Sequence, residues 1–243
     1  MEFVGLHKLA ISRLCDQLMR LGTVFLFIGV IAACSSQQNH STAEHVSINL
    51  TSSDLETHGL AFISPSTVTG REEDKQAIAF IFAKVLSKER PNIRQMSLPH
   101  TLAAINQAGL ATEYKTMLQN YRTTGIFEQN TLVKIGDAIN IRYLLQLNLA
   151  NFNQGSHGRF SLLGLRLFQT KHAEIRIFIQ IWDSHTGSIV WEGVEELILA
   201  EDTSSEKVIN FTTVVEASSR NLIKLFPYKN LSPEPVYQAP PTQ

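Results

Sequence analysis

The chain has 243 residues, with 21 Lys and Arg against 22 Asp and Glu, which gives a formal net charge of −1. Hydrophobic residues make up 44% of it, a proportion that is ordinary for a globular protein and excludes a fully disordered chain. The balanced charge argues against a nucleic-acid-binding protein, and two cysteines are too few for a disulfide scaffold.

The N-terminal region has the composition of a secretory signal. Residues 21–31 are uncharged and mostly apolar, basic residues precede them and small residues follow. A run of this length is too short for a membrane-spanning helix, which needs about 20 residues, but it fits the apolar part of a signal peptide. We expect residues 1–33 to be a signal peptide, and both Met1 and Met19 remain open as the start of translation.

A possible lipid attachment site follows the apolar run. The segment Ile31-Ala32-Ala33-Cys34 resembles the lipobox of bacterial lipoproteins. That resemblance implies cleavage between Ala33 and Cys34, acylation of the Cys34 thiol and anchoring in membrane lipid. In the sorting pattern of bacteria with two membranes, Ser35 implies the periplasmic face of the outer membrane.

The remainder of the chain divides by composition into three segments. Residues 34–58 contain the lipidated cysteine followed by a polar stretch that we interpret as a flexible tether. Residues 59–227 are long enough to bury a core, and we expect a single domain there. Residues 228–243 are rich in proline and are predicted to be a disordered tail.

The first half of the domain is predicted to consist of a strand–helix–strand unit and three shorter helices. The helix of this unit should start at a capping box, Thr69 to Glu72, and end before Pro91. A strand, a helix and a strand of this length indicate a crossover between parallel strands. The predicted elements are a strand at 60–63, the long helix to about 90, a strand at 92–96, and helices near 99–108, 114–121 and 132–139, the first two of the three shorter helices being ended by Gly109 and Gly125.

The second half alternates with a period of two, which is typical of strands. We expect strands at 142–149, 160–168, 175–182 and 188–199, a polar loop at 151–158, a tight turn at 183–187, and a final helix that starts at a capping box, Thr203 to Glu206. The predicted fold class is therefore α+β, with a mixed sheet, a C-terminal antiparallel meander, and amphipathic helices on at least one face.

No catalytic or metal-binding constellation is evident. The histidines are scattered without ligand spacing, so no metal is predicted. Because the sequence also contains no recognisable catalytic or nucleotide-binding motif, the prediction is no cofactor and no enzyme activity. Acidic residues cluster at 72–74, interpreted as helix-start charge, and at Glu192, Glu195 and Glu196, interpreted as a solvated strand face. Trp182 and Trp191 flank the predicted turn, and they are either packing residues or a contact patch.

The order of these features resembles a group of envelope lipoproteins that includes the curli secretion protein CsgG, the penicillin-binding-protein activator LpoB and the N-terminal domain of TolB. The resemblance rests on the lipobox, the tether, the strand–helix–strand unit, residues 140–145, and the meander through Trp182 and the segment 188–191. It implies a CsgG/TolB-N-like periplasmic domain that works by protein–protein contact or by forming a secretion pore.

We therefore expect a non-enzymatic lipoprotein that binds an unknown envelope protein in envelope assembly, secretion or cell-wall synthesis. Self-association stays open. The first alternative is a subunit of a CsgG-like outer-membrane secretion pore, against which the predicted strands leave no spare hairpin for crossing a bilayer. The second is an envelope hydrolase with dispersed carboxylates.

Overall fold

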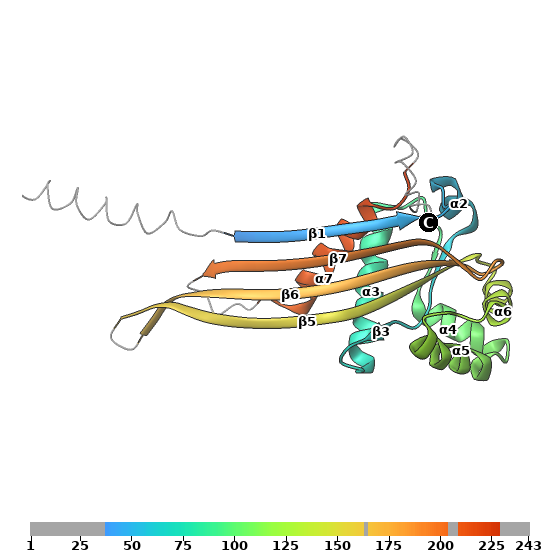
Figure 1. Ribbon diagram of the computed structural model, residues 1–243, viewed down its shortest axis with the longest axis horizontal. Coiled ribbons are helices and arrows are strands. Elements are labelled where there is room, and N and C mark those ends of the chain that lie inside the picture. Colours follow the sequence, from blue (N-terminus) through green and yellow to red (C-terminus); the bar gives the residue numbers. More distant parts are fainter. Residues whose placement is uncertain (1–36, 163–164, 204–208, 229–243) are drawn as a thin grey trace, which may run out of the picture. The chain divides into compact units, whose positions relative to one another are not determined.

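The computed structural model describes residues 37–162, 165–203 and 209–228 (Figure 1). The predicted signal peptide with Ala33, the predicted lipidation site Cys34, and residues 229–243 of the predicted tail lie outside these ranges. The chain divides into two compact units. One consists of residues 1–38, 156–171 and 200–206, and the other of residues 39–155, 172–199 and 207–243.

The described strands form one mixed sheet. Its order is β1-β7-β6-β5-β2-β4, and β3 pairs with β5 beside this path. The strands are β1 (Gln37–Ser47), β2 (Leu60–Phe62), β3 (Ser66–Thr67), β4 (Gln95–Met96), β5 (Tyr143–Leu162), β6 (Leu165–Asp183) and β7 (Ser188–Thr203). The parallel pairing of β2 with β4 confirms the predicted crossover, and β5, β6 and β7 form the predicted meander.

The helices of the first half begin and end close to their predicted positions. Gly125 caps the second of the short helices at φ 71°, a left-handed conformation that glycine adopts without strain. The helices are α2 (Ser52–His58), α3 (Glu72–Glu89), α4 (Leu98–Gln107), α5 (Ala111–Thr124), α6 (Gln129–Ile139) and α7 (Phe211–Lys224). No helix in the described ranges is long and apolar enough to span a membrane.

Helices cover both faces of the sheet within the larger unit, so the fold is α+β as predicted. In Figure 1, α3 and α7 lie behind the strands, while α4, α5 and α6 group near the turn between β6 and β7. On the first face, Ile177 and Ile179 belong to one core with Phe82 of α3 and Leu222 of α7. On the second face, the core contains Ile105, Met117, Ile135, Leu144 and Trp182.

The predicted tether is structured from residue 37 onward. β1 runs beside β7, and the Ile48 amide donates to the Val190 carbonyl at 2.8 Å. Thr51 then starts α2 with a capping box that it shares with Asp54. The prediction of a flexible segment was wrong here because an edge strand is held by backbone hydrogen bonds, which require no apolar side chains.

The predicted loop at 151–158 is also wrong, because these residues continue β5. The strand predicted at 160–168 instead covers the last residues of β5, which ends at Leu162, and the first residues of β6, which begins at Leu165. Polar side chains are compatible with this pairing, since Asn151 Nδ2 donates to Glu174 Oε1 at 2.7 Å. β5, β6 and β7 have 20, 19 and 16 residues, so they are longer than predicted.

Neither predicted capping box starts its helix. The N-cap of α3 is Arg71, and the Thr69 hydroxyl instead donates to Asp74 Oδ2 at 2.6 Å. The N-cap of α7 is Asn210, whose side chain accepts from the Thr213 amide at 2.8 Å. Thr203 is the last residue of β7, so a capping sequence alone did not locate either helix start.

Candidate functional site

The edge strand β1 is joined to the rest of the larger unit by a small polar cluster. Ser41 contacts Glu195 of β7, and His45 stacks on Trp191 of β7 with ring centroids 5.9 Å apart. A step of four residues forward along β1 matches a step of four residues backward along β7. The two strands are therefore antiparallel, as their arrows in Figure 1 show.

Glu195 is the centre of this cluster and is fully buried. Its Oε1 accepts from the Ser41 hydroxyl and from Asn221 Nδ2 of α7, each at 2.8 Å. Its Oε2 has no hydrogen-bond partner among the described residues. Burial raises the pKa of the Glu195 carboxyl, while the hydrogen bonds from Asn221 and Ser41 act in the opposite direction.

The interpretation of Glu195 as part of a solvated face was wrong. Trp191, Leu197 and Leu199 are buried on the same side of β7, and alternation along a strand places Glu195 among them. Glu192 and Glu196 differ from Glu195 in this respect, since their positions fall on the opposite side of the strand. They bond to Gln180 and Arg176 respectively, as solvent-facing polar pairs do.

The two tryptophans do not form an exposed contact patch. Trp182 is 2% exposed and Trp191 is fully buried. Trp182 packs against Phe127 with ring centroids 5.0 Å apart, and Trp191 packs against Phe226 at 4.8 Å. Because they belong to separate cores on opposite faces of the sheet, both are packing residues.

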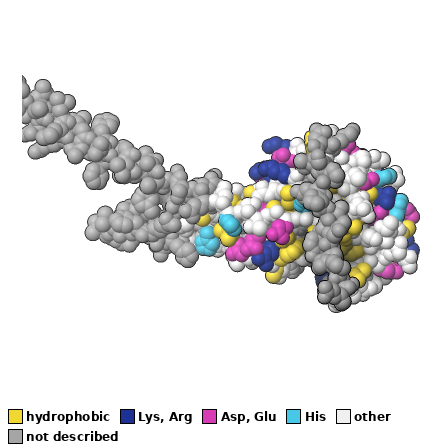
Figure 2. All heavy atoms as spheres, turned by 45° about the horizontal axis from the view of Figure 1, so that its top comes forward, with side chains coloured by type: hydrophobic (Ala, Val, Ile, Leu, Met, Phe, Trp, Pro, Cys, Tyr) yellow, Lys and Arg dark blue, Asp and Glu magenta, His cyan; other side chains and the backbone are white. Residues whose placement is uncertain are grey.

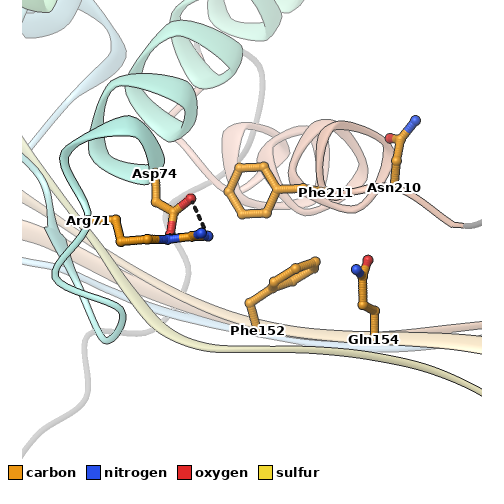
Figure 3. Close-up of a pocket in the computed structure, with 6 residues that line it drawn as sticks. All are labelled: Arg71, Asp74, Phe152, Gln154, Asn210 and Phe211. Carbon is orange, nitrogen blue, oxygen red and sulfur yellow. Dashed lines mark hydrogen bonds and ion pairs between the residues drawn. The ribbon is translucent and has the colours of Figure 1, made fainter.

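A surface hollow of about 450 Å³ lies between β5 and the first turns of α3 and α7 (Figure 3). Phe152 and Phe211 form an edge-to-face pair within it, with ring centroids 5.0 Å apart. Arg71 and Asp74 form a two-point ion pair on its other side, with both nitrogen–oxygen distances 3.0 Å. Gln154 and Asn210 complete the lining. Since the charges of this hollow pair with each other, it offers a recess of mixed polarity rather than a charged binding site.

Charged groups elsewhere are paired or dispersed. Figure 2 shows basic and acidic side chains on one face with hydrophobic ones between them. At the acidic start of α3, Glu72 is also paired, with Lys75 at 3.1 Å. In the part of the chain that the structure describes, no three His, Cys, Asp or Glu side chains gather as a metal site would require.

Apolar exposure occurs at the end of β1. Val46 is 53% exposed and Ile48, one residue past the strand, is 50% exposed.

The roles of Ser41 and Asn221 were not predicted from the sequence, because their partner Glu195 is more than twenty residues away in the chain. The alternation of β7 was a signal that could have placed Glu195 on the inner face.

Comparison with family models finds no match, and neither does comparison with curated protein sequences. Among solved structures, the chain is similar to a subunit of the PelC dodecamer from Paraburkholderia phytofirmans, with 10% identity and a TM-score of 0.47 over 78% of this chain and 100% of that chain. It is also similar to the LpoB C-terminal domain from Escherichia coli, with 12% identity and a TM-score of 0.34 over 57% of this chain and 82% of that chain.

A third similar structure is lipoprotein GNA1162 from Neisseria meningitidis, with 8% identity and a TM-score of 0.33 over 68% of this chain and 98% of that chain. At such low identities and TM-scores, these likenesses assign neither a partner nor an activity to this chain.

Proposed function

We propose that the chain is a lipid-anchored envelope protein, held through acylated Cys34 at the periplasmic face of the outer membrane. Its α+β domain acts by binding another envelope protein in envelope assembly, secretion or cell-wall synthesis, and not by catalysis. The observation that carries the proposal is the lipobox-like segment Ile31-Ala32-Ala33-Cys34 after a signal-like apolar run.

The early start of β1 supports a domain held close to the membrane. Gln37, the first residue of β1, lies three positions after Cys34. Three residues span at most about 11 Å of extended chain. The anchor would therefore act almost directly on the edge strand, in place of the long tether that the sequence predicted.

The arrangement of polar groups supports binding over catalysis. Most of the acidic residues that the sequence singled out contact basic or amide side chains, and Glu195 is buried with Ser41 and Asn221. The larger unit exposes a long sheet edge, apolar side chains that include Val46 and Ile48, and the hollow beside Phe152. Such features suit contact with a protein surface.

The anchor is tested by expressing the full chain in a bacterium with two membranes and labelling with radioactive palmitate. We expect a labelled, processed form that globomycin converts to an unprocessed precursor. Cys34→Ser should abolish both labelling and processing. Cys15→Ser is the matched control and should change neither, because Cys15 precedes the predicted cleavage site. A processed, unlabelled product from the unaltered chain would contradict the proposal.

Binding is tested by chemical crosslinking in the same cells, followed by isolation of the full chain through a C-terminal tag. We expect a discrete envelope protein attached to the unaltered chain and lost from Cys34→Ser. Recovery of the chain without any crosslinked protein would contradict an adaptor function, while leaving the anchor intact.

A further inference from the structure

β1 leaves a long edge of the sheet without a neighbour. It is the terminal strand, and none of the described residues forms a strand on its other side. β1 has 11 residues, whereas β4 at the opposite edge has two. An edge strand exposes a row of backbone N–H and C=O groups that can pair with another strand.

β1 also lacks several of the features by which natural proteins protect such edges. Lysine, proline, bulges and short length are the common protections. Residues 39–47 read N-H-S-T-A-E-H-V-S and contain no Lys, Arg or Pro. The side chains of His40, Thr42, Glu44 and Val46 are all exposed. This edge therefore combines length, extended conformation and access.

The sequence of β1 is complementary to itself in one antiparallel register. If two copies pair with Thr42 opposite Thr42, His40 of each copy lies opposite Glu44 of the other. Opposite Thr–Thr pairs are favourable across strands, and an imidazole N–H can donate a hydrogen bond to a carboxylate opposite it. Centring the pair on Glu44 would instead oppose two carboxylates, and centring it on His40 would oppose two imidazoles.

We propose that the chain self-associates through β1, by antiparallel pairing of two copies centred on Thr42, which joins their two sheets into one. The occupant of the free edge is thus a second copy of this chain. The exposed apolar side chains of Val46 and Ile48 lie close to the pairing segment and add contact area. The pairing depends on residues 39–45 alone, so it does not rest on the proposed lipid anchor.

The test is disulfide trapping in the full chain, purified in detergent, with Cys15 and Cys34 both changed to Ser. In that background an introduced cysteine is the only thiol, since the sequence contains two cysteines. Directly opposed residues of an antiparallel pair have Cα atoms about 4.5–5.5 Å apart, which a disulfide bridges. Thr42→Cys should therefore give a covalent dimer on mild oxidation.

Glu44→Cys is the matched control, because it lies on the same exposed side two residues further on. In the proposed register the two copies of residue 44 are about 13 Å apart, too far for a disulfide. We expect about tenfold more dimer from Thr42→Cys than from Glu44→Cys. Mixing a His40→Cys chain with a differently tagged Glu44→Cys chain should give a mixed dimer.

Equal trapping of Thr42→Cys and Glu44→Cys would overturn the register. Monomers from Thr42→Cys, with the circular dichroism of the parent chain, would overturn self-association through β1. The Thr42→Cys variant expressed in cells should also form a disulfide-linked dimer. A disulfide to a different protein instead of the dimer would contradict the proposal that a second copy of this chain pairs with β1.

Discussion

Ser41 and Glu195 lie 154 positions apart in the chain, yet the Ser41 hydroxyl donates a 2.8 Å hydrogen bond to the Glu195 carboxyl. Asn221 donates to the same oxygen, so one buried acceptor connects β1, β7 and α7. A buried carboxyl costs less in its neutral form, which makes this junction sensitive to the charge of Glu195.

The first prediction is that Glu195→Gln stabilises the domain at neutral pH. The folded-state pKa of Glu195 is raised by burial, so its stabilising contribution is present below the unfolded pKa of about 4.3 and is lost as pH rises through the folded pKa. Glutamine keeps the oxygen that accepts from Ser41 and Asn221 and removes the charge. We expect a gain of about 1 kcal/mol at pH 7 and none at pH 4, from urea unfolding followed by tryptophan fluorescence.

Glu196→Gln is the control for this experiment. Glu196 is a neighbour of Glu195 in the chain but is 37% exposed at its side chain and pairs with Arg176. Its substitution should change the free energy of unfolding by less than about 0.5 kcal/mol. Stabilisation of Glu195→Gln that is equal at pH 4 and pH 7 would show that the charge of Glu195 is not the cause.

The second prediction concerns the ion pair at the β6–β7 turn. Arg142 Nε and Nη2 donate to the two carboxylate oxygens of Asp183 at 2.9 and 2.6 Å, and the Asp183 side chain is 4% exposed. Arg142→Met should destabilise the domain by about 3 kcal/mol at pH 7, because it leaves a buried carboxylate unpaired. Asp183→Asn should cost less, since the exposed part of Arg142 stays hydrated.

The pH dependence of this pair distinguishes the charge from packing. Burial alone would raise the pKa of Asp183. The hydrogen bonds from Arg142 and from the His185 amide lower it by more than burial raises it, so the pKa of Asp183 lies below its ordinary value. The stability from this carboxylate is therefore present above the unfolded pKa of about 3.9 and is lost as pH falls through the folded pKa. Asp183→Asn should remove this loss of stability at acid pH. If the free energy of unfolding of Asp183→Asn fell with pH as it does in the parent chain, the Asp183 carboxylate would not be the cause of the loss.

The third prediction is that Gly136→Ala is destabilising, although alanine normally favours a helix interior by about 1 kcal/mol over glycine. A Cβ at position 136 would lie 2.8 Å from Ser184 Cβ, and closer still to its hydroxyl oxygen. We expect a loss of about 1–3 kcal/mol in urea unfolding. Ser184→Gly in the same chain should recover most of it, and additive effects of the two changes would contradict a steric cause.

The fourth prediction tests where α7 begins. Asn210→Ala should cost about 1 kcal/mol of stability, because the Asn210 side chain accepts from the Thr213 amide at the helix N-terminus. Asn210→Asp retains an acceptor and should restore most of that stability. Thr203→Ala removes the other candidate cap and should have an effect below about 0.5 kcal/mol. A larger loss of stability from Thr203→Ala than from Asn210→Ala would contradict Asn210 as the N-cap of α7.

The helices of the first half could be predicted because their signals are local. Apolar residues such as Leu132 and Ile135 recur at helical spacing, and Gly125 marks a helix end by its positive φ. Helices cover both faces of the sheet, which agrees with the prediction of amphipathic helices on at least one face.

The strand boundaries and the buried cluster could not be predicted in the same way. The polar residues of β1 and of 151–158 become strands through backbone pairing, β1 with the distant β7 and 151–158 with the following strand β6, and that pairing leaves no periodic apolar pattern. Glu195 was grouped with its neighbours in the chain, whereas the alternation of β7 separates it from Glu192 and Glu196. The Ser41 and Asn221 contacts depend on tertiary structure and have no local signal.

The unequal edges of the sheet also limit how far an assembly could grow. β1 offers 11 residues, while β4 at the other end offers two, too few to template another strand. Two copies paired along β1, about a two-fold axis perpendicular to the strand, would each have used their long edge. Of the described strands, each copy would then present only the short β4 at its outer edge. The proposed association through this edge would therefore stop at two chains and would not propagate into a fibril.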